Sequence, residues 1–308
     1  MLLSLLVVAC VHHIPDPGAA AAGAVDPEPS ATSDVTVCWL EFATGSLPHG
    51  TAVAHGALHK NVDSTQSGLL FKSSLGNWLV DGGQAADVKA ELKDVKGLAG
   101  LFIHQDAAGW TVEATPAQAL LRAGVAAGQL TGVIPTHAHF DHLGGLLDLG
   151  VPVLLPQAEI DLAQAVVAGS GFGVLPREAA ALLPRAKPLA WTGGPVLYWD
   201  RSYDLYGDGT VVLFPLPGHT PGSLGVRVRV PSRPGTELLL VGDTVWVREG
   251  YEQREPKGWL AAGFDADGDV NDSQIAKLWQ LHQARPDLHI LPAHDRRAWA
   301  EAFGVPGC

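Results

Sequence analysis

Residues 136–145 read Thr136-His137-Ala138-His139-Phe140-Asp141-His142-Leu143-Gly144-Gly145, and they place three histidines and one aspartate within six residues. The apolar run 133–135 in front of them predicts the end of a short buried strand. In an extended segment the side chains of His137 and His139 fall on the same side, because strand geometry repeats every two residues. These two histidines can therefore share one metal ion. We expect the chain to turn at Asp141 and His142 toward the two glycines, which would point both side chains at a second ion.

Further candidate ligands lie downstream, each behind an apolar run that predicts a strand. They are His219 after residues 210–214, Asp243 after 238–242 and His294 after 289–293. A single histidine in such a loop would be interpreted as a solvated surface residue. The whole set of histidines and aspartates requires a different interpretation. Imidazole and carboxylate groups packed this closely lose their hydration, and a bound cation compensates for that loss. Ligand sites in open sheets collect at the C-terminal ends of strands, so the recurrence predicts one shared site.

The His-x-His-x-Asp-His loop, the Gly-His turn, the Gly-Asp pair and the late histidine together resemble the metallo-β-lactamase superfamily over most of residues 35–298. The resemblance implies an α/β fold, the αβ/βα sandwich of two mixed sheets flanked by helices, in a hydrolase domain over residues 35–308. It also implies two divalent metal ions. The first would be bound by His137, His139 and His219 and the second by Asp141, His142 and His294, with Asp243 bridging the two.

Composition limits the partners of the chain. The 308 residues are 47% hydrophobic and 17% charged, enough to bury a large core in one domain or two. The formal net charge of −12 argues against nucleic acid, because phosphate binding relies on lysine and arginine. A small-molecule substrate is the expected partner.

The N-terminus predicts export. Residues 1–10 form an apolar run too short to span a bilayer, which needs about 20 residues, so a signal-peptide core is the better interpretation. The end of this run, Val7-Val8-Ala9-Cys10, resembles the bacterial lipobox, which implies lipidation of Cys10 and a periplasm-facing lipoprotein of the bacterial cell envelope. No lysine or arginine precedes the run, so a chance resemblance is the alternative. Residues 11–34 are rich in Ala, Pro, Gly and Asp, and this composition predicts a flexible linker. The lipid on Cys10 is then the only contact with the membrane that we expect.

Hydrophobic periodicity and capping signals predict the remaining elements. Beyond those named above, the expected strands are 35–43, 69–71, 78–80 and 151–155, and the expected helices are 87–95, 117–127, 157–168 and 273–284. Thr115-Pro116 is a helix-start signal. A loop with His49, His55 and His59 would either overhang the site or carry solvated histidines. Residues 169–195 could form a helical lid or a substrate wall.

Two further features leave alternatives open. Cys38 and Cys308 are a possible disulfide pair in an oxidising compartment, but sequence cannot show whether they meet. Residues 265–272 superficially resemble a calcium loop, yet Val270 and Ala276 stand where that loop needs glycine and glutamate. An acidic turn that caps the following helix is the better interpretation.

The predicted site has a defined chemistry. Two divalent ions with a bridging carboxylate would hold a hydroxide between them, which makes a nucleophile without a covalent intermediate. Asp141 is the candidate to pass a proton to the leaving group. Zinc suits the histidine and aspartate ligands, although iron or manganese would also fit them.

Within the superfamily, the resemblance is closest to the N-acyl-homoserine lactone lactonases and the related organophosphate hydrolases. Asp243 stands where β-lactamases usually carry cysteine or serine, and only 14 residues follow His294, whereas glyoxalase-type thioesterases carry a helical extension there. The sequence therefore predicts a hydrolase of lactones or similar esters, with organophosphate or glyoxalase-type thioester hydrolysis as the alternative. An iron oxidoreductase or a ligand-binding protein of the same fold is a weaker alternative.

Three aromatic residues are candidate substrate contacts: Phe140, Trp246 and Tyr251. The lactonases carry a tyrosine at the position of Trp246, and an indole N–H can donate a hydrogen bond but cannot accept one or ionise. Tyr251 could substitute for it. Each of the three could equally be core packing.

Overall fold

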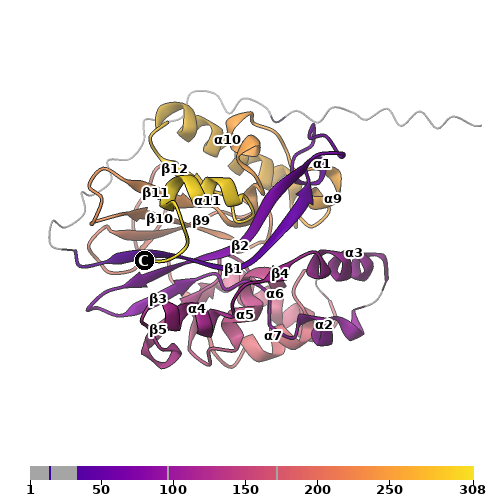
Figure 1. The fold of residues 1–308 in the computed structure, drawn as a ribbon, viewed down its shortest axis with the longest axis horizontal. Coiled ribbons are helices and arrows are strands. Elements are labelled where there is room, and N and C mark those ends of the chain that lie inside the picture. Colours follow the sequence, from indigo (N-terminus) through magenta and orange to yellow (C-terminus); the bar gives the residue numbers. More distant parts are fainter. Residues whose placement is uncertain (1–13, 15–32, 96, 171–172) are drawn as a thin grey trace, which may run out of the picture.

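The computed structural model of the chain describes Ile14 and residues 33–95, 97–170 and 173–308. Within them, two sheets lie face to face and helices cover their outer faces (Figure 1). Each sheet contains both parallel and antiparallel strand pairs. This confirms the predicted sandwich of two mixed sheets flanked by helices.

The first sheet has seven strands in the order β4-β1-β2-β3-β5-β6-β7, and the second has five in the order β12-β11-β10-β9-β8. The strands of the first sheet are β1 (Thr36–Pro48), β2 (Asn61–Lys72), β3 (Asn77–Val80), β4 (Thr111–Val112), β5 (Leu130–Ile134), β6 (Val153–Pro156) and β7 (Ala186–Leu189). Those of the second are β8 (Tyr203–Asp204), β9 (Val211–Pro215), β10 (Leu224–Arg229), β11 (Glu237–Leu240) and β12 (His289–Leu291).

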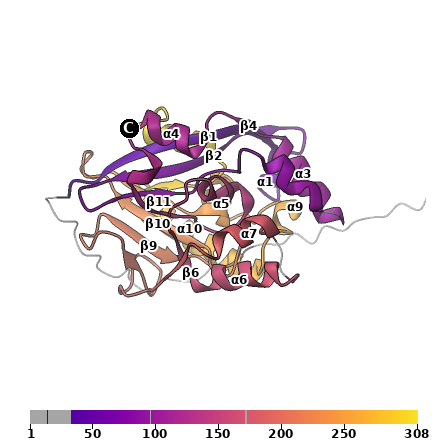
Figure 2. The same ribbon diagram turned by 90° about the horizontal axis from the view of Figure 1, so that it is seen from below.

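Helices α4 to α7 lie on the first sheet, where Figure 2 shows α5, α6 and α7 together, and α10 lies over the second. Helix α11 lies beside β12 and β2, at the edge of the layer between the sheets. The α-helices are α1 (His49–Ala52), α2 (Val88–Glu91), α3 (Gly97–Ala108), α4 (Pro116–Arg122), α5 (Phe140–Leu147), α6 (Gln157–Val167), α7 (Pro176–Leu182), α8 (Arg248–Glu252), α9 (Trp259–Ala262), α10 (Gly268–Ala284) and α11 (Arg296–Phe303). Three 3₁₀ helices are Leu92–Asp94, Ala127–Gln129 and Gly242–Thr244.

Alternating side chains of the strands build separate core layers. Leu69 and Phe71 of β2 pack between the sheets, whereas Leu70 packs under the helices of the first sheet. In the second sheet, Leu238 and Leu240 face the layer between the sheets, and Leu239 faces the layer under α10. All of these side chains are fully buried. Because both faces of each sheet are covered, the central strands are apolar at successive positions rather than at alternate ones.

Capping residues set where two helices begin. The Thr115 hydroxyl accepts a hydrogen bond from the Gln118 backbone N–H and the Gln118 side-chain oxygen accepts one from the Thr115 backbone N–H, which confirms the predicted start of α4. The predicted end at residue 127 is wrong, because the chain leaves the helix before Gly124, whose φ is +80°. The side chain of Asp267 caps α10, so the acidic turn is a cap as predicted, but the helix begins at Gly268 rather than at residue 273.

Two predicted irregular segments are more regular than expected. β1 and β2 extend well past their predicted ends and pair along their length, so the histidine-bearing loop is short and His49 begins α1. Residues 169–195 contain α7, which packs against α5 and α6, and β7, which is the edge strand of the first sheet. The expectation of a lid or a substrate wall is wrong for the described residues of this segment, since none of them lines the pocket described below.

A disulfide between Cys38 and Cys308 joins the last residue of the chain to β1. Cys38 is fully buried, and Trp39 and Gly307 exchange two backbone hydrogen bonds of 3.0 and 2.8 Å beside it. The pairing that the sequence left open is therefore present. It holds the end of the chain on β1, where Cys38 packs in the layer under the helices of the first sheet and the neighbouring Trp39 packs near Trp299 between the sheets.

The predicted signal segment and Cys10 lie outside the described residues, as does most of the predicted linker. The described residues of that linker contact the domain. Ile14 is buried among the residues under α10, the Ser33 hydroxyl accepts a hydrogen bond from Thr210, and the Asp34 carboxylate accepts one from Ser73. Among the described residues, no helix combines the length and the apolar character needed to cross a membrane.

Replacement of Cys308 by serine should lower the free energy of unfolding by about 2–5 kcal/mol, because the unfolded chain would lose a long-range crosslink. Cys308 is the better target, since it is exposed whereas Cys38 is buried in the core. Denaturant titration with and without reductant measures the effect. Reductant should weaken the wild type and leave Cys308→Ser unchanged; equal stability of the two oxidised proteins would contradict a stabilising role.

Candidate metal centre

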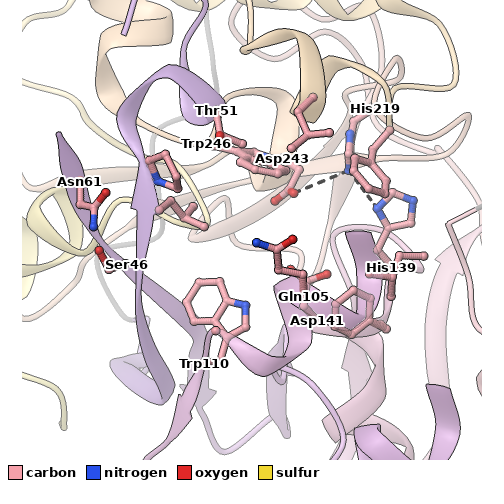
Figure 3. Close-up of a pocket in the computed structure, with 17 residues that line it drawn as sticks. Ser46, Thr51, Asn61, Gln105, Trp110, His139, Asp141, His219, Asp243 and Trp246 are labelled. Carbon is pink, nitrogen blue, oxygen red and sulfur yellow. Dashed lines mark hydrogen bonds and ion pairs between the residues drawn. The ribbon is translucent and has the colours of Figure 1, made fainter. Parts of the chain in front are cut away.

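All seven predicted ligands meet at one end of the sandwich. His137 and His139 lie in the segment that follows β5, and Asp141 and His142 lie in the first turn of α5. The others follow three strands of the second sheet: His219 follows β9 in a turn, Asp243 lies in the 3₁₀ helix after β11, and His294 follows β12. In Figure 3 the side chains of His139, Asp141, His219 and Asp243 converge at one end of the pocket, with Ser46 and Asn61 at the other.

The ligand atoms form overlapping groups of three. In each group they lie within 4.8 Å of one another: His137, His139 and His219; His137, His142 and Asp243; Asp141, His142 and His294. Asp243 faces both sides of the cluster. Its Oδ2 atom lies 3.6 Å from His219 Nε2, and its Oδ1 atom lies 3.1 Å from His142 Nε2 and 3.3 Å from His294 Nε2. This is the arrangement expected of a carboxylate shared between two cations.

The residues present fit such ions. His137 Nε2, His142 Nε2 and Asp243 Oδ1 are buried and have no hydrogen-bond partner among the described residues. Buried polar atoms rarely stay unpaired, because leaving them so is costly. Imidazole and carboxylate groups suit zinc and other divalent transition metals. The described residues therefore offer the donors of a metal site, and the contacts of these atoms are mainly with one another.

Electrostatics lead to the same conclusion. Burial and the neighbouring His219 lower the pKa of His139 to about 3, so this imidazole is neutral and free to bind a cation. Burial also opposes protonation of His294, but the carboxylates of Asp243 and Asp141 outweigh it and raise the pKa of His294 to about 10. Asp243 responds in the opposite direction, since His294 and His142 overcome its burial and hold its pKa well below the usual range. The acidic side of the site thus requires positive charge, from protons or from metal ions.

The local backbone differs from the prediction at one point. Asp141 and His142 do not lie in a turn before the two glycines, because α5 begins at Phe140 and includes both glycines. Those glycines permit close packing instead. A Cβ atom on Gly145 would lie 2.2 Å from the Gly82 carbonyl oxygen, so only glycine lets α5 pack against the segment after β3.

A buried carboxylate behind His142 was missed by the sequence reasoning. Asp81 Oδ2 lies 3.0 Å from His142 Nδ1, and its two oxygens also accept hydrogen bonds from the backbone N–H and hydroxyl of Thr136. Such outer carboxylates orient a ligating imidazole. The signal was available, because Asp81 directly follows a predicted strand, as the ligands do.

Glu159 ties together two of the ligand-bearing segments. Its carboxylate, which lies on α6 and is fully buried, accepts hydrogen bonds from the backbone N–H groups of Ala138 and Gly222, each 2.8 Å long. It also accepts one from the Thr220 hydroxyl at 2.6 Å. No sequence signal could have identified it, because its partners lie 21 and 63 residues away.

Behind His219 lies a pair of opposite charges. Asp265 Oδ1 lies 2.7 Å from His219 Nδ1, and Lys257 contacts the same oxygen. Asp265 was predicted to belong to the acidic helix cap, but Asp267 supplies the cap and Asp265 faces the metal site instead. Lys257 carried no signal in the sequence.

A pocket of about 600 Å³ opens beside the ligands. It is lined by the following residues: Ser46, Leu47, Pro48, Thr51, Asn61, Ile103, Gln105, Gly109, Trp110, His139, Phe140, Asp141, His219, Asp243, Trp246, Leu260 and Phe264. The ring centroids of Trp110 and Trp246 lie 5.6 and 5.5 Å from the ring centroid of His294. The metal ligands lie at one end of the pocket, and the rest of the wall is mostly apolar, with the polar side chains Ser46, Thr51, Asn61 and Gln105 among the apolar ones.

Of the three predicted substrate contacts, Phe140 and Trp246 line this pocket and Tyr251 does not. Tyr251 takes the alternative of core packing, because α8 directs its ring into the core under α10, where its ring centroid lies 5.3 Å from that of His282. None of His49, His55 and His59 lines the pocket either. His55 pairs with Glu255, which agrees with the interpretation of these residues as loop histidines.

Comparison with known proteins identifies relatives of this site. A family model described as the Metallo-beta-lactamase superfamily matches residues 64–294. The N-acyl homoserine lactonase AttM of Rhizobium radiobacter is 27% identical over 183 residues, which are 56% of this chain and 61% of that protein. The match therefore spans about three fifths of the length of that relative.

Solved structures share the fold. An N-acyl homoserine lactone hydrolase with the product N-hexanoyl-L-homoserine at its catalytic metal center has a TM-score of 0.65 and 19% identity over 88% of this chain and 98% of that chain. AidC, a dizinc quorum-quenching lactonase, has a TM-score of 0.57 and 16% identity over 87% of this chain and 89% of its own. At these identities the likeness shows the fold alone.

Replacement of Asp243 by alanine should reduce the metal content of the purified protein from about two equivalents per chain to about one, because the shared carboxylate would be lost. Elemental analysis of both proteins measures the change. Asp287→Asn, which alters an exposed carboxylate away from the site, is the control and should retain the wild-type content. A wild-type content near one that survives Asp243→Ala would exclude the shared role.

Proposed function

The chain belongs to the metallo-beta-lactamase superfamily, and from this premise we propose that it is a metal-dependent hydrolase that opens lactones or cleaves similar neutral esters. The observation that carries the proposal is the position of Asp243, whose two carboxylate oxygens face the two groups of ligands at the polar end of an apolar pocket. The lactonase relatives named above support the choice of substrate.

Each part of the site has a role in this proposal. The site would hold two divalent metal ions, and zinc suits its ligands best. When bound, such ions would lower the pKa of a water molecule and polarise the carbonyl of the substrate. Asp141 lines the pocket, and its Oδ2 atom lies 3.3 Å from His294 Nε2. From this position its carboxylate would take up the proton that the attacking water releases and pass it to the departing oxygen of the ester. Phe140 and Trp246 would pack against the apolar part of the substrate.

The pocket favours a neutral substrate. None of the residues that line it is lysine or arginine, so the described wall offers no cationic side chain to an anionic group. This counts against the glutathione thioester, which carries carboxylates. A lactone with an apolar acyl chain matches the apolar wall, while Gln105 and Asn61 provide polar contacts along it. A neutral phosphotriester would match the same wall, so organophosphate hydrolysis is the second candidate.

Hydrolysis of a substrate panel tests the proposal. Metal-loaded protein is expected to turn over acyl-homoserine lactones faster than aryl phosphotriesters, and to leave lactoylglutathione and a cephalosporin nearly untouched. Asp141→Asn should abolish turnover, because an amide cannot take a proton from the attacking water and pass it to the leaving oxygen. Preference for phosphotriesters would select the second candidate, and preference for lactoylglutathione would refute the neutral-substrate argument.

We also propose that the protein is exported and held at the bacterial cell envelope through Cys10. The Cys38–Cys308 disulfide supports export, because disulfides persist in oxidising compartments. Mass spectrometry of the mature protein from membranes should find an acylated N-terminal Cys10, and Cys10→Ser should release the protein from the membrane fraction. A wild-type protein that keeps Met1 and fractionates with the cytosol would refute this proposal.

A further inference from the structure

A buried lysine stands next to the metal site. The side chain of Lys257, between α8 and α9, is 1% exposed. Its ammonium group lies 2.7 Å from the backbone carbonyl oxygen of Asp243 and 3.0 Å from His219 Nδ1, and it forms an ion pair with Asp265. Lysine is rarely buried to this extent unless it is paired, because its charge must leave water.

The charge of Lys257 does not favour metal binding. A cation near two bound cations repels them, and burial strengthens that repulsion because the local dielectric is low. Asp265 offsets the charge of Lys257, and its own pKa is lowered, since Lys257 and His219 overcome its burial. The net charge of Lys257 and Asp265 together is therefore close to zero. Two apolar side chains would cost less free energy to bury than this ion pair, so charge compensation alone does not explain why a lysine is present.

The contacts of Lys257 suggest a geometric role. Asp265 Oδ1 accepts hydrogen bonds from both His219 Nδ1 and Lys257, which explains why those two nitrogens lie only 3.0 Å apart. With its Nδ1 atom donating, His219 presents Nε2 to the cluster, 3.0 Å from His139 Nδ1. On its other side Lys257 donates to the peptide of Asp243, which lies in a short 3₁₀ turn whose backbone is not helical at Asp243 itself.

We propose that Lys257 is a positioning residue for the metal centre: it holds the backbone of the shared ligand Asp243 and, through Asp265, the imidazole of His219. It would thereby fix the separation of two ligands that come from different strand ends. The inference rests on the proposed two-metal function. The competing explanation is that Lys257 only neutralises Asp265.

Four proteins separate the two explanations: wild type, Lys257→Met, Asp265→Asn and the double variant. Each is freed of metal and titrated with Zn²⁺ against a chromophoric chelator, and Co²⁺-loaded samples are compared by visible absorption, which reports ligand geometry. Methionine keeps the volume and removes the donor. Lys187→Met, at an exposed position on β7, is the matched control and should behave as the wild type.

If Lys257 positions the ligands, Lys257→Met should weaken binding of at least one Zn²⁺ by about tenfold or more and change the Co²⁺ spectrum, although loss of a positive charge alone would tighten binding. The double variant should stay weak, because neutralising Asp265 does not restore the hydrogen bond to Asp243. Wild-type or tighter affinity in Lys257→Met, or recovery in the double variant, would overturn the proposal.

Circular dichroism of the metal-free proteins checks that each variant folds. Should Lys257→Met fail to fold, Lys257→Gln replaces it, since the amide keeps an N–H donor and should give a smaller loss of affinity than tenfold. A Gln variant that binds either ion more tightly than the wild type, as loss of the charge alone predicts, would count against the proposal. If the wild type binds two Zn²⁺ ions but hydrolyses no member of the panel, the substrate proposal fails while the role of Lys257 stands.

Discussion

The structure depends on the concentration of imidazole and carboxylate groups around Asp243. One carboxylate faces two groups of ligands, and the buried side chains around it contact mainly one another. Imidazoles and carboxylates that are buried together lose their hydration, so cations are the natural means of satisfying them. Such a site couples metal binding to folding, because the ligands come from four separate strand ends that only the folded chain brings together.

Buried charged residues from other elements hold the ligand segments in place. Asp81 supports His142, Glu159 joins the segments of His137 to His139 and of His219, and Asp265 with Lys257 supports His219. Each support lies on a different element from the ligand it contacts. The ligand segments themselves are loops and first helical turns. Their positions therefore depend on the hydrogen bonds that these surrounding residues make to them.

The chemistry of the pocket follows from the contrast between its two parts. The metal end is strongly polar, whereas the wall is apolar and, among the described residues that line it, carries no lysine or arginine. Trp110 and Trp246 flank His294 and bring the apolar wall up to the ligands. The proposed substrate would place its ester carbonyl at the metal end and its apolar chain along the wall.

The sequence by itself identified the candidate ligands, because the spacing of His137, His139, Asp141 and His142 and the recurrence of such residues after predicted strands are local patterns. The resemblance carried by these motifs implied the two-sheet fold, and a capping signal marked the start of α4. Only the tertiary structure decided the rest. Tyr251 turns into the core, Cys38 meets Cys308, and Asp81, Glu159 and Lys257 reach the site. Those contacts join residues far apart in the chain, and their geometry is set by the packing of the two sheets and their helices, which no local pattern records.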